Sequence, residues 1–168
     1  ARIFSLFDYC NSLYYGINMS LVNKLQRVQN CAAKLIFKNR IPSSRLDEKF
    51  LKLHWLKIKY RIIYKIILIV HNCLKQNAPK EIMSLIEPGD SNRTLHLKHT
   101  RTMTKYGDRA FSHMGPKLWN MLPIRIRTVE ETECFKTKLK SFLLLHGDIY
   151  DGQHEYYFHQ YLSIIKFA

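Results

Sequence analysis

The feature that most constrains the fold is a nearly continuous run of large apolar residues from Ile62 to Leu74. It lies inside residues 57–75, which have helical spacing, and residues 66–70 are apolar on every side. Lys65 and His71 interrupt the run, which is shorter than the roughly 20 residues that a helix needs to cross a bilayer. We therefore expect a long helix at the centre of a hydrophobic core. Its polar stripe consists of Lys57, Arg61, Lys65, Asn72 and Lys75.

Three further helices are expected before the central one, over residues 3–15, 20–38 and 44–53. Gly16 can end the first of them in a left-handed conformation. Ser20 and Ser44 can cap the other two, because a serine side chain accepts a hydrogen bond from a free amide at a helix start. Pro42 separates these two helices, since proline disrupts a helix interior.

The character of the sequence changes at residues 88–90, where Pro-Gly-Asp is typical of a sharp turn. Before it, Pro79 can start a helix of about two turns. Beyond it, residues 92–106 are polar, basic and rich in threonine, and the Gly-Asp step at residues 107–108 suits a short β-hairpin. The Gly and Pro positions of residues 105–123 favour a turn followed by a short helix.

A last helix is predicted from Thr128, which stands three residues before Glu131 as in a capping box. Its apolar face consists of Phe135, Leu139, Phe142 and Leu143. The residues after Gly147 are rich in Tyr and His and lack a clear period.

These elements predict a mainly α fold, a helical bundle-like domain with a small β-hairpin between the central helices and the last helix. The expected parts are an N-terminal helical part (1–90), a basic loop or hairpin with the C-terminal helices of the same domain (91–145), and a tail (146–168).

The charge of the chain favours polyanionic partners. Lys and Arg total 27 against 13 Asp and Glu, which gives a formal net charge of +14. Nucleic acid is a better expectation than a membrane surface. An AT-rich coding bias towards Lys, Ile, Asn and Tyr is the alternative explanation of the charge. The main basic stretch contains Arg93, Lys98, Arg101, Lys105, Arg109 and Lys117, with Arg125 and Arg127 nearby.

Aromatic side chains interleave with these cations, and each has two possible roles. His96, His99, Tyr106 and Phe111 could stack on unpaired bases. Burial is the expected role of Tyr106 and Phe111, because large aromatic rings usually fold inward. Trp55 and Trp119 lie among leucines and are expected to anchor the core.

No catalytic or metal-binding pattern stands out. The cysteines at positions 10, 31, 73 and 134 form no CxxC pair, so reduced and mostly buried thiols are expected. His154 and His159 resemble the HExxH motif, but the second histidine comes one residue too late to share a helix face with the first. Phosphate-binding and nucleophile-elbow motifs are absent, and there is no adjacent Asp-Asp pair for two magnesium ions. We expect no enzyme activity, no cofactor and no metal.

Five ordered blocks between residues 5 and 145 stand out as motifs. They are Asp-Tyr-Cys-Asn-Ser at 8–12, Leu-Gln-Arg-Val-Gln-Asn-Cys-Ala-Ala-Lys-Leu-Ile at 25–36, Leu-His-Trp-Leu at 53–56, Gly-Asp-Arg-Ala-Phe-Ser at 107–112 with Pro-Lys-Leu-Trp-Asn at 116–120, and Phe-Lys at 135–136 with Leu-Lys at 139–140. Together these blocks resemble the C-terminal part of LINE-type (non-LTR) retrotransposon reverse transcriptases of the jockey and chicken-repeat kind.

The resemblance implies a thumb-side, largely helical region that follows the polymerase palm, whose catalytic aspartates are not in this chain. Such a region would be non-catalytic, would grip template and primer RNA or DNA, would join the rest of the reverse transcriptase, and would work in the nucleus or cytoplasm. Helix-borne cations would supplement the basic stretch, namely Lys24, Arg27, Lys34, Arg61 and Lys65.

Two alternatives remain open beside nucleic-acid binding. The chain could be a structural or protein-interaction helical module that docks on the polymerase palm, or an inert remnant of a decayed element. Salt dependence separates the first from nucleic-acid binding, because phosphate contacts weaken steeply as salt rises and apolar docking does not.

Overall fold

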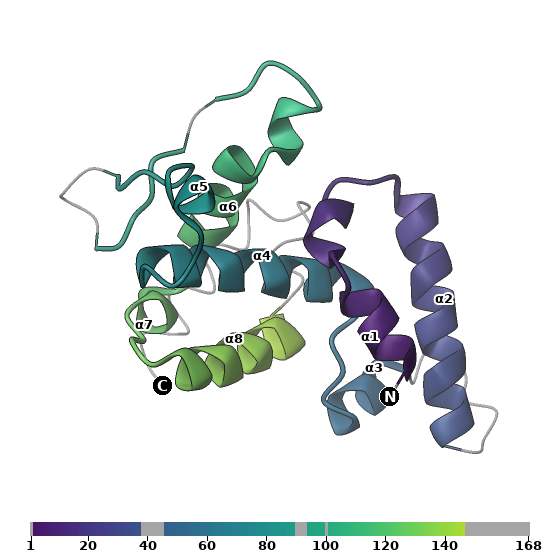
Figure 1. Cartoon of the computed structure of the whole chain (residues 1–168). Coiled ribbons are helices and arrows are strands. Elements are labelled where there is room, and N and C mark those ends of the chain that lie inside the picture. Colours follow the sequence, from purple (N-terminus) through teal and green to yellow (C-terminus); the bar gives the residue numbers. More distant parts are fainter. Residues whose placement is uncertain (1, 38–45, 90–93, 100, 147–168) are drawn as a thin grey trace.

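The computed structural model describes residues 2–37, 46–89, 94–99 and 101–146, and the fold is mainly α-helical (Figure 1). The α-helices are α1 (Arg2–Asp8), α2 (Met19–Ile36), α3 (Leu46–Lys52), α4 (Ile58–Leu74), α5 (Lys80–Met83), α6 (Phe111–Asn120), α7 (Ile124–Arg127) and α8 (Thr132–His146). Two 3-10 helices are described as well, η1 (Asn11–Tyr14) and η3 (Gly107–Arg109).

Helix α4 is the centre of the fold, as its apolar run predicts. Ile66, Ile67 and Val70 are completely buried. The helix crosses the molecule with α2 beyond one end, α6 on one side and α8 on the other, and it contacts all three (Figure 1). One hydrophobic cluster extends along α4 and includes residues from Val22 to Leu143.

The prediction of a single helix over residues 3–15 is wrong, because the chain turns after α1. Cys10 has a left-handed backbone with φ 48°, which a continuing right-handed helix does not allow. The 3-10 helix η1 follows, and its buried Asn11 donates a hydrogen bond from Nδ2 to Asp8 Oδ1 at 3.4 Å. Gly16, with φ 69°, ends this region as expected of a glycine.

Asn18, and not Ser20, caps α2. Its Oδ1 accepts a hydrogen bond from the amide of Ser20 at 2.9 Å, so Ser20 lies inside the first turn. Both residue types are good caps, and the sequence alone favours neither.

The two tryptophans are packed as core residues. Trp119 is buried against α4 and α8, and its Nε1 donates to the carbonyl oxygen of Leu95 at 2.9 Å. Trp55 is partly buried beside α3, where Leu46 and Phe50 form a second, smaller cluster with α2. The interpretation of both indoles as core anchors is therefore confirmed.

The predicted β-hairpin at residues 107–108 is not formed. This step belongs to η3, in which the Gly107 amide donates to Thr104 Oγ1 at 3.0 Å. The described residues contain no sheet; Pro88 and Leu97 pair in an isolated antiparallel bridge. Asn120 fixes this bridge from α6, because its side chain accepts from the Leu97 amide and donates to the Leu97 carbonyl oxygen.

Two predicted helix starts are corrected further along the chain. Helix α5 is one turn long instead of two, and Pro79 is its N-cap instead of its first residue. Thr128 is the C-cap of α7, so the predicted capping box with Glu131 is wrong and α8 begins at Thr132. The predicted apolar face of α8 is confirmed as buried. It consists of Phe135, Leu139, Phe142 and Leu143.

The cysteines are free thiols, but only part of the expectation for them holds. Cys73 is buried and Cys134 partly buried, whereas Cys10 and Cys31 are exposed. Among the described helices, none combines the length and the apolar character that crossing a membrane requires. Pro42, Ser44, Arg93 and the tail after residue 146 lie outside the described residues.

Candidate nucleic-acid interface

The basic residues of the candidate site separate into paired and unpaired cations. Lys98 is exposed but forms an ion pair with Glu87 at 2.7 Å, and this hydrogen bond raises the pKa of Lys98. Arg101, Lys105 and Lys117 are exposed, and within the described residues they make no ion pair and no side-chain hydrogen bond. These unpaired cations are the ones that can meet a phosphate without first losing a partner.

Tyr106 directly follows Lys105 and is exposed, which corrects the expectation that it is buried. Its side chain is 85% exposed, whereas Phe111 packs partly buried against the core as expected. The loop around Tyr106 is closed by Thr102, whose hydroxyl donates to the Asp108 carboxylate. A large aromatic ring is thus presented to solvent by a short structured loop beside Lys105.

Arg109 lies against the backbone of Gly16, which connects the basic loop with the start of α2. A Cβ atom at Gly16 would stand 2.9 Å from Arg109 Cγ and 3.0 Å from its Nε. Glycine is required here for two reasons, the positive φ and this close approach. Residues that are far apart in sequence therefore set the position of one candidate cation.

Replacing Gly16 by alanine is expected to lower the free energy of unfolding by about 1–2 kcal/mol, because alanine is strained at φ 69° and its methyl group displaces Arg109. Urea unfolding measures the loss. Gly89→Ala is not a suitable control for this substitution, because a Cβ atom at Gly89 would meet the backbone of His96. A stability equal to that of the parent chain would contradict the close approach of Arg109.

Two histidines lie beside the loop. The rings of His99 and His113 are 4.4 Å apart, and His113 Nε2 is 3.8 Å from Asp108 Oδ1. Partial burial and then the charges of His113 and Lys117 lower the pKa of His99. His99 is therefore neutral at pH 7 and adds an aromatic face to the site without a charge.

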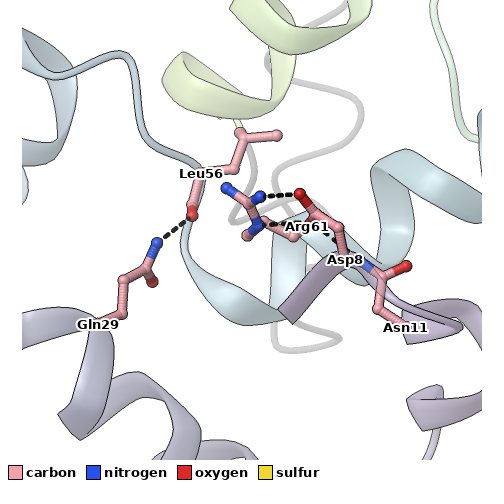
Figure 2. Close-up of polar contacts among 5 residues, drawn as sticks. All are labelled: Asp8, Asn11, Gln29, Leu56 and Arg61. Atoms are coloured by element: carbon pink, nitrogen blue, oxygen red, sulfur yellow. Dashed lines mark hydrogen bonds and ion pairs between the residues drawn. The ribbon is translucent and has the colours of Figure 1, made fainter. Parts of the chain in front are cut away.

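Arg61, one of the predicted binding residues, is paired with an acidic side chain. Its Nε donates to Asp8 Oδ1 at 3.0 Å and its Nη2 donates to Asp8 Oδ2, so the carboxylate is held by both nitrogens (Figure 2). The guanidinium also lies 4.7 Å from the ring centre of Phe4. Lys65, one turn further along α4, stays exposed.

A polar junction between α2 and the start of α4 was missed by reasoning from the sequence. Gln29 is completely buried, and its Nε2 donates to the carbonyl oxygen of Leu56 at 2.8 Å (Figure 2). Gln26 Oε1 accepts from the amide of Ile58, the first residue of α4, at 2.9 Å. The signal was present, because Gln26 and Gln29 share the helical spacing of Val22 and Ala33.

Three of the predicted binding residues belong to α2. Lys24 and Arg27 are exposed and Lys34 partly so, on a helix along one edge of the fold (Figure 1). The structure therefore does not gather all predicted binding residues into one site. Arg101, Lys105 and Arg109 are exposed in the same stretch of the sequence, four residues apart, and Arg93 lies outside the described residues.

No metal site accompanies this group. Within residues 2–37, 46–89, 94–99 and 101–146, no three His, Cys, Asp or Glu side chains are close enough together to hold an ion. The chain matches no protein-family model, and comparison with curated proteins and with solved structures found no match either.

Proposed function

We propose that this chain is a non-catalytic, thumb-side part of a LINE-type reverse transcriptase that contacts template or primer nucleic acid. The observation that carries the proposal is the exposed Tyr106 ring in a stretch of the chain that also exposes three cations without an acidic partner in the described structure, Arg101, Lys105 and Arg109. The five ordered sequence blocks support the reverse transcriptase origin.

The chemistry of this loop suits a nucleic-acid strand. Phosphate oxygens are bound by Lys and Arg, while an exposed aromatic ring can stack on an unpaired base of any sequence. Asp108 is the one carboxylate in the loop, and Thr102 donates a hydrogen bond to it. Because this carboxylate already accepts a hydrogen bond, it repels a nearby phosphate less strongly.

The testing experiment measures binding of the chain to a labelled RNA–DNA hybrid with a single-stranded overhang across a salt series. The triple variant Arg101→Ala/Lys105→Ala/Arg109→Ala is expected to bind about tenfold to a hundredfold more weakly at low salt. Its slope of log affinity against log salt is expected to be shallower by about 2–3. Tyr106→Ala is expected to cost about 1–3 kcal/mol on the overhang and much less on a blunt duplex.

Lys98→Ala is the matched control, because Lys98 is exposed in the same region but paired with Glu87. Its affinity is expected to stay within about twofold of the parent chain, since a paired surface cation contributes little. Absence of binding at low salt would contradict the proposal, and so would a loss in the control as large as in the triple variant.

A further inference from the structure

An exposed line of side chains runs along the outer face of α2. Leu21, Val28 and Leu35 are 48%, 49% and 78% exposed. Each is seven residues from the next, which is close to two helical turns, so the three lie in one row. Lys24 and Cys31, both exposed, complete the row at the alternating spacing of three and four residues that characterises a coiled-coil seam.

The opposite face of α2 already serves the fold. Val22, Gln29 and Ala33 are buried there, towards α4 and α3. The row of Leu21, Val28 and Leu35 faces away from them, and α2 lies along one edge of the molecule (Figure 1). Nothing in the described part of the chain covers this row, although its spacing is that of a packing surface.

The narrow width of the row favours another helix as its binding partner. A row of side chains spaced alternately three and four residues apart is narrower than the broad apolar face with which a helix lies on a membrane. One partner helix, inserting its side chains between Leu21, Val28 and Leu35, would cover it completely. The 18 residues of α2 provide about five turns for this contact.

The positive charge of α2 favours a partner with acidic side chains. The helix contains Lys24, Arg27 and Lys34 and has no acidic residue. Lys24 lies within the row, while Arg27 and Lys34 each precede one of its apolar members. In an antiparallel pair of two copies Arg27 would face Lys34, and in a parallel pair Lys24 would face Lys24, so self-association is opposed by like charges.

We propose that the outer face of α2 binds an amphipathic helix of a partner protein whose apolar stripe is flanked by Asp or Glu. Leu21, Val28 and Leu35 fill the seam, and Lys24, Arg27 and Lys34 pair with the flanking carboxylates. This inference does not rest on nucleic-acid binding, because it uses other residues than Arg101, Lys105 and Arg109.

A synthetic three-heptad helix with Leu at the seam and Glu on both flanks is the probe, used below the concentration at which it associates with itself. Its binding to the chain is measured by fluorescence anisotropy, beside a matched peptide with Lys in place of Glu. Leu21→Ser/Val28→Ser/Leu35→Ser is expected to weaken binding of the Glu peptide at least tenfold. The Lys peptide is expected to bind at least tenfold more weakly than the Glu peptide.

Ile124→Ser/Leu145→Ser is the control variant, because both residues are exposed apolar side chains away from α2. It is expected to bind the Glu peptide like the parent chain, and all variants are expected to keep the parent's circular dichroism spectrum and affinity for the RNA–DNA hybrid. Equal binding of the two peptides or no binding would overturn the proposal. A dimer of the parent chain in sedimentation that the triple variant abolishes would also overturn the proposal. Binding of the chain to phosphatidylserine vesicles but not to the peptide would overturn it as well.

Discussion

Replacing Gln29 by alanine is expected to lower the free energy of unfolding by about 3 kcal/mol. The side chain is completely buried, and its Nε2 donates to the Leu56 carbonyl oxygen at 2.8 Å. Alanine would leave that oxygen buried without a partner and would also open a cavity between α2 and the start of α4. Both effects act in the same direction, so the loss exceeds that of a typical surface substitution.

The loss should spread to the start of α4, because Gln29 holds its neighbour in place. Gln29 Oε1 accepts from Gln26 Nε2 at 3.0 Å, and Gln26 Oε1 in turn accepts from the Ile58 amide. Amides in the first turn of a helix have no partner inside the helix, so this acceptor replaces a missing cap. Amide hydrogen exchange is therefore expected to become faster at Ile58.

Urea unfolding measures the stability change, with Asn23→Ala as the matched control on the exposed side of α2. The control is expected to change the free energy of unfolding by less than about 0.5 kcal/mol. If Gln29→Ala lost no more stability than this control, the junction would not be part of what holds α2 to α4.

The sequence predicted the packing elements well because hydrophobic spacing is a local property. Within the all-round apolar residues 66–70, Ile66, Ile67 and Val70 are buried and the other two are partly buried. The face of α8 around Phe135 and Leu139 is buried as expected. Helix ends were less accurate. Asn18 and Ser20 are equally good caps, and only the path of the chain after Gly16 decides which one reaches a free amide.

The hairpin was mispredicted because turn residues do not specify their partners. Gly107 and Asp108 suit a hairpin turn, but the threonines around them bond within the loop and leave no strand to pair with it. The chain pairs Pro88 with Leu97 instead, and Leu97 is buried although its neighbours are polar. Asn120 of α6, which is distant in sequence, accepts a hydrogen bond from the Leu97 amide and thereby holds Leu97 in this bridge.

The sequence did not show which of the candidate residues are paired and which are exposed. Arg61 and Asp8 are 53 positions apart, and nothing local shows that they form a pair. Tyr106 was expected to be buried because aromatic rings usually are, whereas it is 85% exposed in a loop that packs against itself through Thr102 and Asp108. Which cations and rings reach solvent is thus a property of the assembled fold.

The stability of the fold is expected to fall as the pH decreases below about 6.5, chiefly because of His71. This imidazole is 1% exposed and stacks on Phe135 with the ring centres 3.9 Å apart. Burial lowers its pKa below 6.5 and the charge of Lys75 lowers it further, while the hydrogen bond from Nε2 to the Val129 carbonyl oxygen and a weaker one involving Asn72 act against them. The native state therefore holds His71 neutral.

The sign of the effect follows from which state binds the proton. Below pH 6.5 the unfolded chain protonates His71 while the folded chain does not, so the unfolded state is favoured as pH falls. The expected loss is about 1.4 kcal/mol for each pH unit below 6.5, until the folded-state pKa is reached. Above pH 6.5 His71 is mainly neutral in both the folded and the unfolded chain, so it adds no further pH dependence to the free energy of unfolding.

Urea unfolding from pH 5 to pH 8 tests this expectation with His71→Phe, which keeps a flat apolar ring against Phe135 and near Trp119 but cannot be protonated. The variant is expected to lose the slope below pH 6.5. His99→Gln is the matched control, because the pKa of His99 is also lowered but its side chain is exposed, so most of the slope should survive. If His71→Phe kept the slope of the parent chain and His99→Gln lost it, the exposed histidine and not the buried one would control the response to acid.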